Sequence, residues 1–229
     1  MSARITGISS MATREVLAEL AGAYLQHSGV VVEFESVGGV DAARRVLAGE
    51  AFDVVVLAAD AIAKLVAAGS VVARSETDLV RSAVAVAVRA GAAVPDIGSE
   101  ATLRDTILHA RSIGYSTGPS GVALMQLFDR WGIAETVRDR LVQAPVGVPV
   151  GQLLASGEVE LGFQQLSELL HFPGIELLGP LPSGAEIITI FSAGRCTTSA
   201  QPEAVRAWLG FMRSPVAEDA MRRHGLAPA

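Results

Sequence analysis

The sequence has very little cysteine and no long apolar run, and both absences limit what the protein can be. Its single cysteine, Cys196, cannot form a disulfide within the chain. No apolar stretch reaches the roughly 18 residues that a membrane-spanning helix needs, so we expect no membrane insertion. Hydrophobic residues nevertheless make up 50% of the 229 positions, enough for a large core in one domain or in two lobes. The sequence therefore predicts a soluble globular protein.

Basic residues are in the minority and do not gather in one segment. The formal net charge is −6, which argues against a nucleic-acid partner because nucleic-acid surfaces are basic. The four histidines, at 27, 109, 171 and 224, lack the spacing of metal ligands. Serine-hydrolase, phosphate-loop and dinucleotide-binding motifs are absent too. We expect no metal and no cofactor, which leaves ligand binding or a simple proton transfer.

The first residues show no charged-then-apolar leader and lead directly into a strand-like stretch at Arg4. The sequence as it stands predicts a cytoplasmic protein, or a periplasmic one if a leader has been removed. The lone cysteine suits the cytoplasm and does not exclude an oxidising compartment.

Strands and helices are expected to alternate along the chain. Strands at 4–8, 30–37 and 52–58 are each followed by a helix, at 12–27, 42–48 and 61–68. The strongest strand, 82–89, precedes a helix at 101–110, a short strand at 112–115 and a helix that ends near 131. Beyond it we expect helices at 136–142 and 151–155, strands at 159–165, 176–179 and 186–191, and closing helices at 202–212 and 215–224. This alternation is typical of an α/β sheet.

The turn at 116–121 has the composition of an anion site. It lies between a strand and an apolar-periodic helix, so the first helix amides have no partner within the helix. Such amides and the positive end of the helix dipole favour a carboxylate or an oxyanion. Ser116, Thr117 and Ser120 add hydroxyls, and Gly118 and Gly121 let a ligand approach the backbone. The alternative is that the hydroxyls cap the helix and the glycines form a turn.

Other polar residues stand at predicted strand ends. Gln164 and Gln165 close the strand at 159–165, and alternation sends them to opposite faces, so we expect at most one to contact ligand. Arg81 precedes the strongest strand and offers a carboxylate a planar two-point contact, or is a surface arginine. Asp41 and Glu168 are possible general bases if the protein is an enzyme, although Asp41 also fits a first helical turn.

The order of these segments resembles that of the type II periplasmic solute-binding proteins, in the branch related to the molybdate-binding proteins of ABC transporters. The resemblance rests on the strand, Ser-Ser and helix at the start, the 42–53 segment, the 116–121 turn, the 161–165 strand end and the Ser214-Pro215 helix. It implies an α/β fold of two lobes, joined by two crossovers, that close about a hinge on a ligand in the cleft between them. The implied lobes are 1–79 plus 194–229 and 80–193.

The resemblance also implies which residues contact the ligand. They are Ser9, Ser10 and Met11, then Gly38, Gly39 and Val40, the 116–121 turn, Gly147 and Gln165, with the register of the first segment open by one or two residues. The molybdate-binding relatives have a serine at the position of Gly39 and a tyrosine at that of Gln165, so two hydroxyl donors are missing here.

We therefore expect a binding protein for a small anion, an organic carboxylate or an oxyanion larger or flatter than molybdate. A transporter permease is the expected partner if the protein is exported. The alternative is a cofactor-independent isomerase of an unsaturated polycarboxylate, because aconitate isomerase is similar to the same branch and such a reaction needs only a base beside an acidic C–H.

Overall fold

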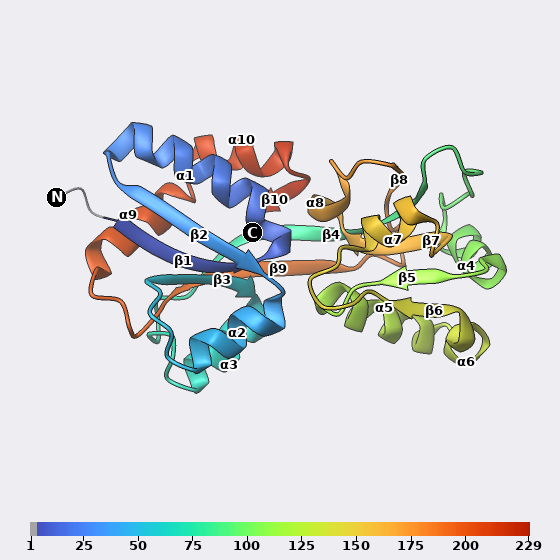
Figure 1. Cartoon of the computed structure of the whole chain (residues 1–229), viewed down its shortest axis with the longest axis horizontal. Coiled ribbons are helices and arrows are strands. Elements are labelled where there is room, and N and C mark those ends of the chain that lie inside the picture. The colour runs from blue at the N-terminus through green and yellow to red at the C-terminus, as the bar shows by residue number, and fades with distance from the viewer. Residues whose placement is uncertain (1–3) are drawn as a thin grey trace. The chain divides into compact units, whose positions relative to one another are not determined.

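A computed structural model describes residues 4–229, which form two compact units (Figure 1). The first unit contains 4–82 and 190–229, and the second contains 83–189. The chain enters the second unit within strand β4 (Thr77–Arg89) and returns within strand β9 (Ile188–Arg195). Both passages between the units are thus made inside strands and not in loops.

The first unit is built on three parallel strands in the order β2-β1-β3. These are β1 (Arg4–Ser10), β2 (Val31–Val37) and β3 (Val54–Ala58). Strand β9 pairs antiparallel with β3, and β10 (Leu226–Pro228) pairs antiparallel with β4. The helical segments of this unit are η1 (Met11–Thr13), α1 (Arg14–Ser28), α2 (Gly39–Leu47), α3 (Ala59–Ala67), α9 (Pro202–Phe211) and α10 (Pro215–Arg223).

Strand β3 is buried on both faces, as its unbroken apolar sequence predicts for a parallel sheet. Val54 and Val56 pack into a core that α1, α9 and α10 complete, around the fully buried Trp208. Val55 and Leu57 pack into a second core with side chains of α2 and α3. Alternation along the strand thus sends successive residues into two different cores.

The second unit has the strand order β4-β7-β5-β6. Strand β5 (Ile113–Tyr115) runs parallel to both β6 (Leu141–Gln143) and β7 (Leu161–Gln165), whereas β7 and β8 (Ile175–Pro180) pair antiparallel with β4. Its helical segments are α4 (Glu100–His109), α5 (Pro119–Arg130), α6 (Ala134–Val137), η2 (Arg138–Arg140), α7 (Val150–Ser156) and α8 (Leu166–Leu169).

Three short elements differ from the sequence-based prediction. The helix expected at 136–142 is wrong in its last part, because Leu141–Gln143 pairs with β5 as strand β6. Helix α8 and strand β10 were not predicted. Elements of three or four residues are too short to show a period of 2 or 3.6 along the sequence.

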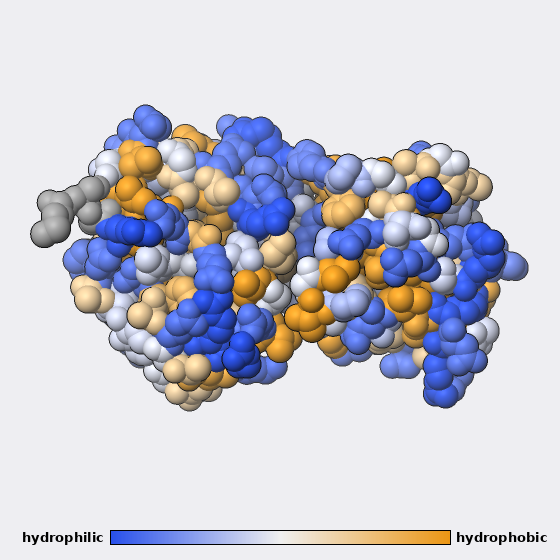
Figure 2. All heavy atoms as spheres, in the orientation of Figure 1, coloured by the Kyte–Doolittle hydropathy of each residue, from blue (hydrophilic) through white to orange (hydrophobic). Residues whose placement is uncertain are grey.

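Polar and apolar side chains are mixed on the visible face of each unit (Figure 2). Between residues 4 and 229, no helix combines the length and the apolar character that crossing a membrane requires.

Candidate functional site

In each unit, parallel strands end at one edge of the sheet and continue into helices. In the first unit, β1, β2 and β3 lead into η1, α2 and α3 (Figure 1). In the second unit, β5, β6 and β7 lead into α5, α7 and α8. Ligands of open α/β sheets bind beyond the carboxyl ends of the strands, so these two edges are the places where a ligand is expected.

The two serines at the end of β1 differ in their hydrogen bonds. Ser9 Oγ is fully buried and lies 2.8 Å from Ser36 Oγ on β2. Ser10 is also buried, with 8% of its surface exposed, but its Oγ has no hydrogen-bond partner among the described residues. A buried hydroxyl without a partner is unfavourable, which makes Ser10 the better candidate for a ligand contact. Met11, half-buried, begins η1 directly after it.

The Gly38-Gly39 turn brings the start of α2 close to Ser10. Gly38 is the N-cap residue, and no side chain caps the helix. A Cβ atom added to Gly39 would lie 3.8 Å from Ser10 Cβ and 3.8 Å from Leu57 Cδ2, both ordinary contact distances. Gly39 therefore leaves room beside Ser10 that a side chain could occupy. Val40 is 73% exposed at the same helix start.

The 116–121 turn precedes α5, with Gly118 as an N-cap residue that provides no side-chain cap. Ser116 Oγ and Ser120 Oγ lie 2.8 Å apart, while Thr117 is exposed. The two glycines have different roles. A Cβ atom on Gly121 would lie 1.9 Å from the Ser116 carbonyl oxygen, whereas one on Gly118 would come no closer than 3.8 Å to any atom. Gly121 is thus required for packing of the turn against α5, and only Gly118 is open.

Hydroxyl side chains do cap helices elsewhere in this protein. Ser99 accepts a hydrogen bond from the Thr102 N–H at 3.1 Å at the start of α4, and Ser214 accepts one from the Ala217 N–H at 3.3 Å at the start of α10. Within the described part of the chain, no side chain caps η1, α2, α3 or α5, the segments that follow β1, β2, β3 and β5. The first amides of these segments are therefore left for a ligand or for water.

The two glutamines at the end of β7 are both buried and make different contacts. Gln164 Oε1 accepts a hydrogen bond from the Val150 N–H at 2.8 Å, and its Nε2 donates to Glu168 Oε2 at 2.6 Å. Gln165 Nε2 donates to Thr189 Oγ1 at 2.7 Å, and its Oε1 has no partner among residues 4–229. The Gln164 side chain therefore stabilises the start of α7, whereas Gln165 Oε1 can still accept a hydrogen bond from a ligand.

Gly147 and Arg81 stand apart from these contacts. Gly147 is exposed in the loop after β6 with a φ of 82°, a left-handed conformation that favours glycine. Arg81 is exposed on β4 opposite Ala227 of β10, and its side chain makes no hydrogen bond or ion pair with another described residue. Their contact with a ligand stays a prediction.

The structure adds two residues that sequence reasoning missed. The Ser36 hydroxyl on β2 forms a hydrogen bond with the Ser9 hydroxyl, and the Thr189 hydroxyl on β9 accepts one from the Gln165 side-chain amide. Each lies more than 20 positions from its partner in the sequence, by separations of 27 and 24 residues, and no local pattern signals such a pairing.

The remaining ionisable groups of the first unit offer limited chemistry. Asp41 forms an ion pair with Arg44 on the surface of α2, which fits a structural role for this acid. Cys196 is 1% exposed, and burial together with the charge of Asp53 raises its pKa to about 12, so the thiol is not a nucleophile near neutral pH. Across the described part of the chain, no cluster of three or more histidine, cysteine, aspartate or glutamate residues could hold a metal ion.

Known proteins resemble this chain in sequence and in fold. The family model for bacterial extracellular solute-binding proteins matches residues 5–227. Aconitate isomerase from a Pseudomonas species is 37% identical over 230 residues, which cover 98% of this chain and 87% of that protein. The molybdate-binding protein ModA of Azotobacter vinelandii is 25% identical over 133 residues, 53% of this chain and 49% of that protein.

A solved structure shows the same architecture. The periplasmic molybdate-binding protein of Azotobacter vinelandii superposes with a TM-score of 0.80 and 19% sequence identity, covering 97% of this chain and 98% of that one. At this identity the structural likeness shows the fold alone, and it confirms the predicted α/β fold of the type II binding proteins. The family model covers nearly the whole described chain and the isomerase is a full-length relative, so the chain belongs to the bacterial extracellular solute-binding protein family.

Proposed function

We propose that this protein binds a small organic polycarboxylate at the helix starts that follow β1 and β2 in the first unit. The observation that carries the proposal is the buried Ser10 hydroxyl, which has no hydrogen-bond partner among residues 4–229 and adjoins the uncapped start of α2. In the second unit, the uncapped start of α5 offers amides beside Ser116 and Ser120. Backbone amides and hydroxyls of this kind are the donors that an anion needs when it leaves water.

Exposed aliphatic side chains favour an organic anion over a bare oxyanion. Val40, Val122 and Val146 are 73%, 58% and 76% exposed, and they follow the ends of β2, β5 and β6. Each stands within a few residues of a helix start or a loop at the candidate edges. A hydrocarbon skeleton can pack against such side chains, whereas a tetrahedral oxyanion gains nothing from them. The glycine at position 39 and the glutamine at position 165 support the same preference.

Calorimetry with citrate as the probe tests this proposal. Ser10→Ala should weaken citrate binding about tenfold, because a hydrogen bond to a charged group contributes roughly 1.5 kcal/mol or more. The same variant should leave the melting temperature of the free protein unchanged or higher, since the hydroxyl it removes has no partner. Ser183→Ala, at an exposed serine of the second unit, is the control and should bind as the parent does. Equal affinity of Ser10→Ala and the parent would contradict the proposal.

A second function, isomerisation of an unsaturated polycarboxylate, is favoured by the 37% identity to aconitate isomerase over nearly the whole chain. A carboxylate base removes a proton from the carbon next to the double bond and exchanges it with water, the double bond shifts by one position, and a proton from the base is added to the former vinyl carbon. The reaction needs no oxidant and no net proton. Glu168 is the better placed of the two candidate bases, because it is half-buried beside Gln164 at the end of β7.

Deuterium exchange separates the two functions. An isomerase should transfer deuterium from D2O into aconitate at the exchanging carbons, as nuclear magnetic resonance would show. Glu168→Gln should abolish this exchange while citrate still binds, and Asp41→Asn should leave the exchange intact. Binding of aconitate without any exchange by the parent protein would leave a binding function and exclude the isomerase.

The family description also supports export and a transporter permease as a partner. Fractionation of cells that express the full native gene would check this. Recovery of the protein with cytoplasmic markers alone would contradict it. Closure of the two units about a hinge stays a prediction of the family resemblance.

A further inference from the structure

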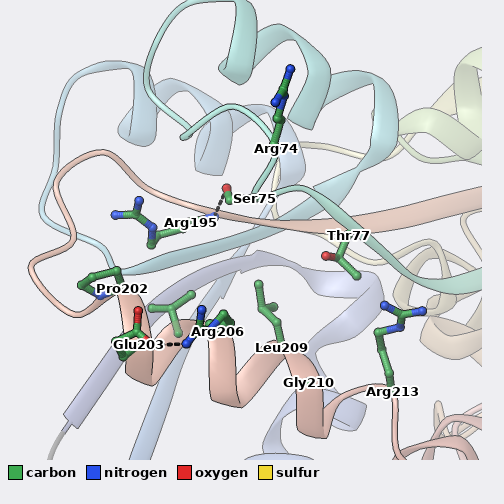
Figure 3. A pocket seen from close by; sticks show the side chains of 11 residues that line it. Arg74, Ser75, Thr77, Arg195, Pro202, Glu203, Arg206, Leu209, Gly210 and Arg213 are labelled. Atoms are coloured by element: carbon green, nitrogen blue, oxygen red, sulfur yellow. Dashed lines mark hydrogen bonds and ion pairs between the residues drawn. The ribbon is translucent and has the colours of Figure 1, made fainter.

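A pocket in the first unit is strongly basic and does not include any of the candidate ligand residues. Its volume is about 420 Å³. Arg195 on its wall pairs with Val54, the first residue of β3, so the pocket lies at the amino end of this strand and not at the carboxyl end. Helix α9 forms one wall, and the segment before β4 forms another (Figure 3).

Arginines and apolar side chains together line this pocket. Four lining residues are arginines, at positions 74, 195, 206 and 213, and Glu203 is the only acid. Val205 and Leu209 of α9 are buried below them. Figure 3 shows the arginines coming from separate elements, with Arg74 before β4, Arg195 at the end of β9, and Arg206 and Arg213 on and after α9.

The charge of the pocket is not balanced by the protein itself. Arg206 pairs with Glu203, but Arg74, Arg195 and Arg213 form no ion pair with any described residue. The lining therefore carries four positive charges and one negative charge, in a chain whose formal net charge is −6. Like charges around one cavity repel each other, and an anion in the cavity removes that repulsion.

The backbone around the pocket is also constrained. The Arg195 N–H donates to Ser75 Oγ at 3.0 Å, and Ser75 Oγ donates to the Val72 carbonyl at 2.6 Å, so the end of β9 holds the segment before β4. Arg74 has a φ of 66°, the only left-handed residue other than glycine among residues 4–229. A long side chain is disfavoured in this conformation, which is often found at binding sites.

We propose that this pocket binds a small organic polyanion, with an apolar or planar body and two or more carboxylate or phosphate groups. Guanidinium groups match both anions through two parallel hydrogen bonds, and the floor of Val205 and Leu209 suits the apolar body. The volume lies within the range of about 300 to 1,000 Å³ that is usual for small-molecule pockets. This pocket is separate from the polycarboxylate site proposed above, because the two sites share no residue.

Calorimetry with two probes tests this proposal. Trimesate, a planar benzene tricarboxylate, represents the carboxylate source, and pyrophosphate represents the phosphate source. The double variant Arg206→Gln, Arg213→Gln changes two exposed side chains of the pocket. The control double variant Arg138→Gln, Arg222→Gln changes two exposed arginines elsewhere that form ion pairs with acids three or four residues away in the sequence. Both double variants remove the same charge from the protein.

We expect at least one probe to bind the parent, and its affinity to fall about tenfold or more in the pocket variant and less than about twofold in the control. Binding should weaken as the salt concentration is raised, and the neutral trimethyl ester of trimesate should not bind. The proposal is overturned by an absence of binding with both probes or by equal losses in the two double variants.

Discussion

Replacement of Gly121 by alanine tests the geometry of the 116–121 turn, because two effects of opposite sign compete there. Alanine is favoured over glycine inside a helix by about 1 kcal/mol, so helix propensity alone predicts a more stable protein. The added Cβ atom, however, would lie 1.9 Å from the Ser116 carbonyl oxygen, and that oxygen belongs to the backbone. The turn must move away from α5 to relieve this overlap.

The cost of that movement is worked out from the contacts. Overpacking a buried position costs typically about 1 to 3 kcal/mol. Loss of the hydrogen bond from the Gly121 N–H to the Gly118 carbonyl, 3.0 Å long, adds about 1 kcal/mol. After the gain in helix propensity, we expect the free energy of unfolding to fall by about 1 to 3 kcal/mol. Gly118→Ala is the matched control, because its nearest neighbour would be 3.8 Å away, and we expect a change of less than about 1 kcal/mol.

Urea unfolding followed by circular dichroism measures both variants. Citrate binding should be weaker in Gly121→Ala, since the amides of α5 shift with the turn. A Gly121→Ala protein that is more stable than the parent would refute the reasoning, because helix propensity would then outweigh the overlap.

Three further predictions concern charged side chains. Arg81→Ala should weaken citrate binding by about 2 to 5 kcal/mol in calorimetry if the ligand desolvates this exposed side chain, with partial rescue by lysine; a loss below about 1 kcal/mol would show that the ligand does not contact Arg81. Arg74→Gly should raise the free energy of unfolding, measured in urea, by up to about 1 kcal/mol, because glycine avoids the left-handed strain at a φ of 66°. Arg74→Lys should not raise it, and a glycine variant less stable than the parent would contradict this prediction. Hydrogen bonds from the backbone and guanidinium of Arg111 lower the pKa of Glu160 from its ordinary value of 4.5. The stability that these hydrogen bonds provide is therefore present above pH 4.5, and it is lost as the pH falls through the lowered pKa of the folded protein. Urea midpoints measured across that pH range should therefore fall less in Glu160→Gln than in the parent, and parallel curves would show that the ion pair does not contribute.

The sequence predicts the fold well because its long elements have clear periodicity. The apolar run of β3 and the β-branched run of β4 identify buried strands, and each is bounded by turn residues. Strand β4 begins at Thr77, five residues before the predicted strand, because the polar residues at its start hide the pattern. Strand β6 was lost inside a predicted helix, since its three residues are defined only by their pairing with β5.

Some features of the candidate site could likewise be predicted from the sequence, and others could not. The 116–121 turn and the Gly38-Gly39 turn could be predicted from the local sequence, because a strand end, small residues and a helix start follow one another there. The difference between Ser9 and Ser10 could not, since it depends on Ser36 of the neighbouring strand. The local sequence could not predict the arginine pocket either, because its walls come from segments more than 100 positions apart. Ser75 and Arg195, for example, are separated by 120 residues.

Calorimetric titration of the parent protein with citrate, aconitate, molybdate and sulfate measures which class of anion it binds. We expect binding of at least one polycarboxylate, with an affinity that exceeds those for molybdate and sulfate, and a loss of about tenfold in Ser10→Ala. Tight binding of molybdate with no response to either polycarboxylate would contradict this.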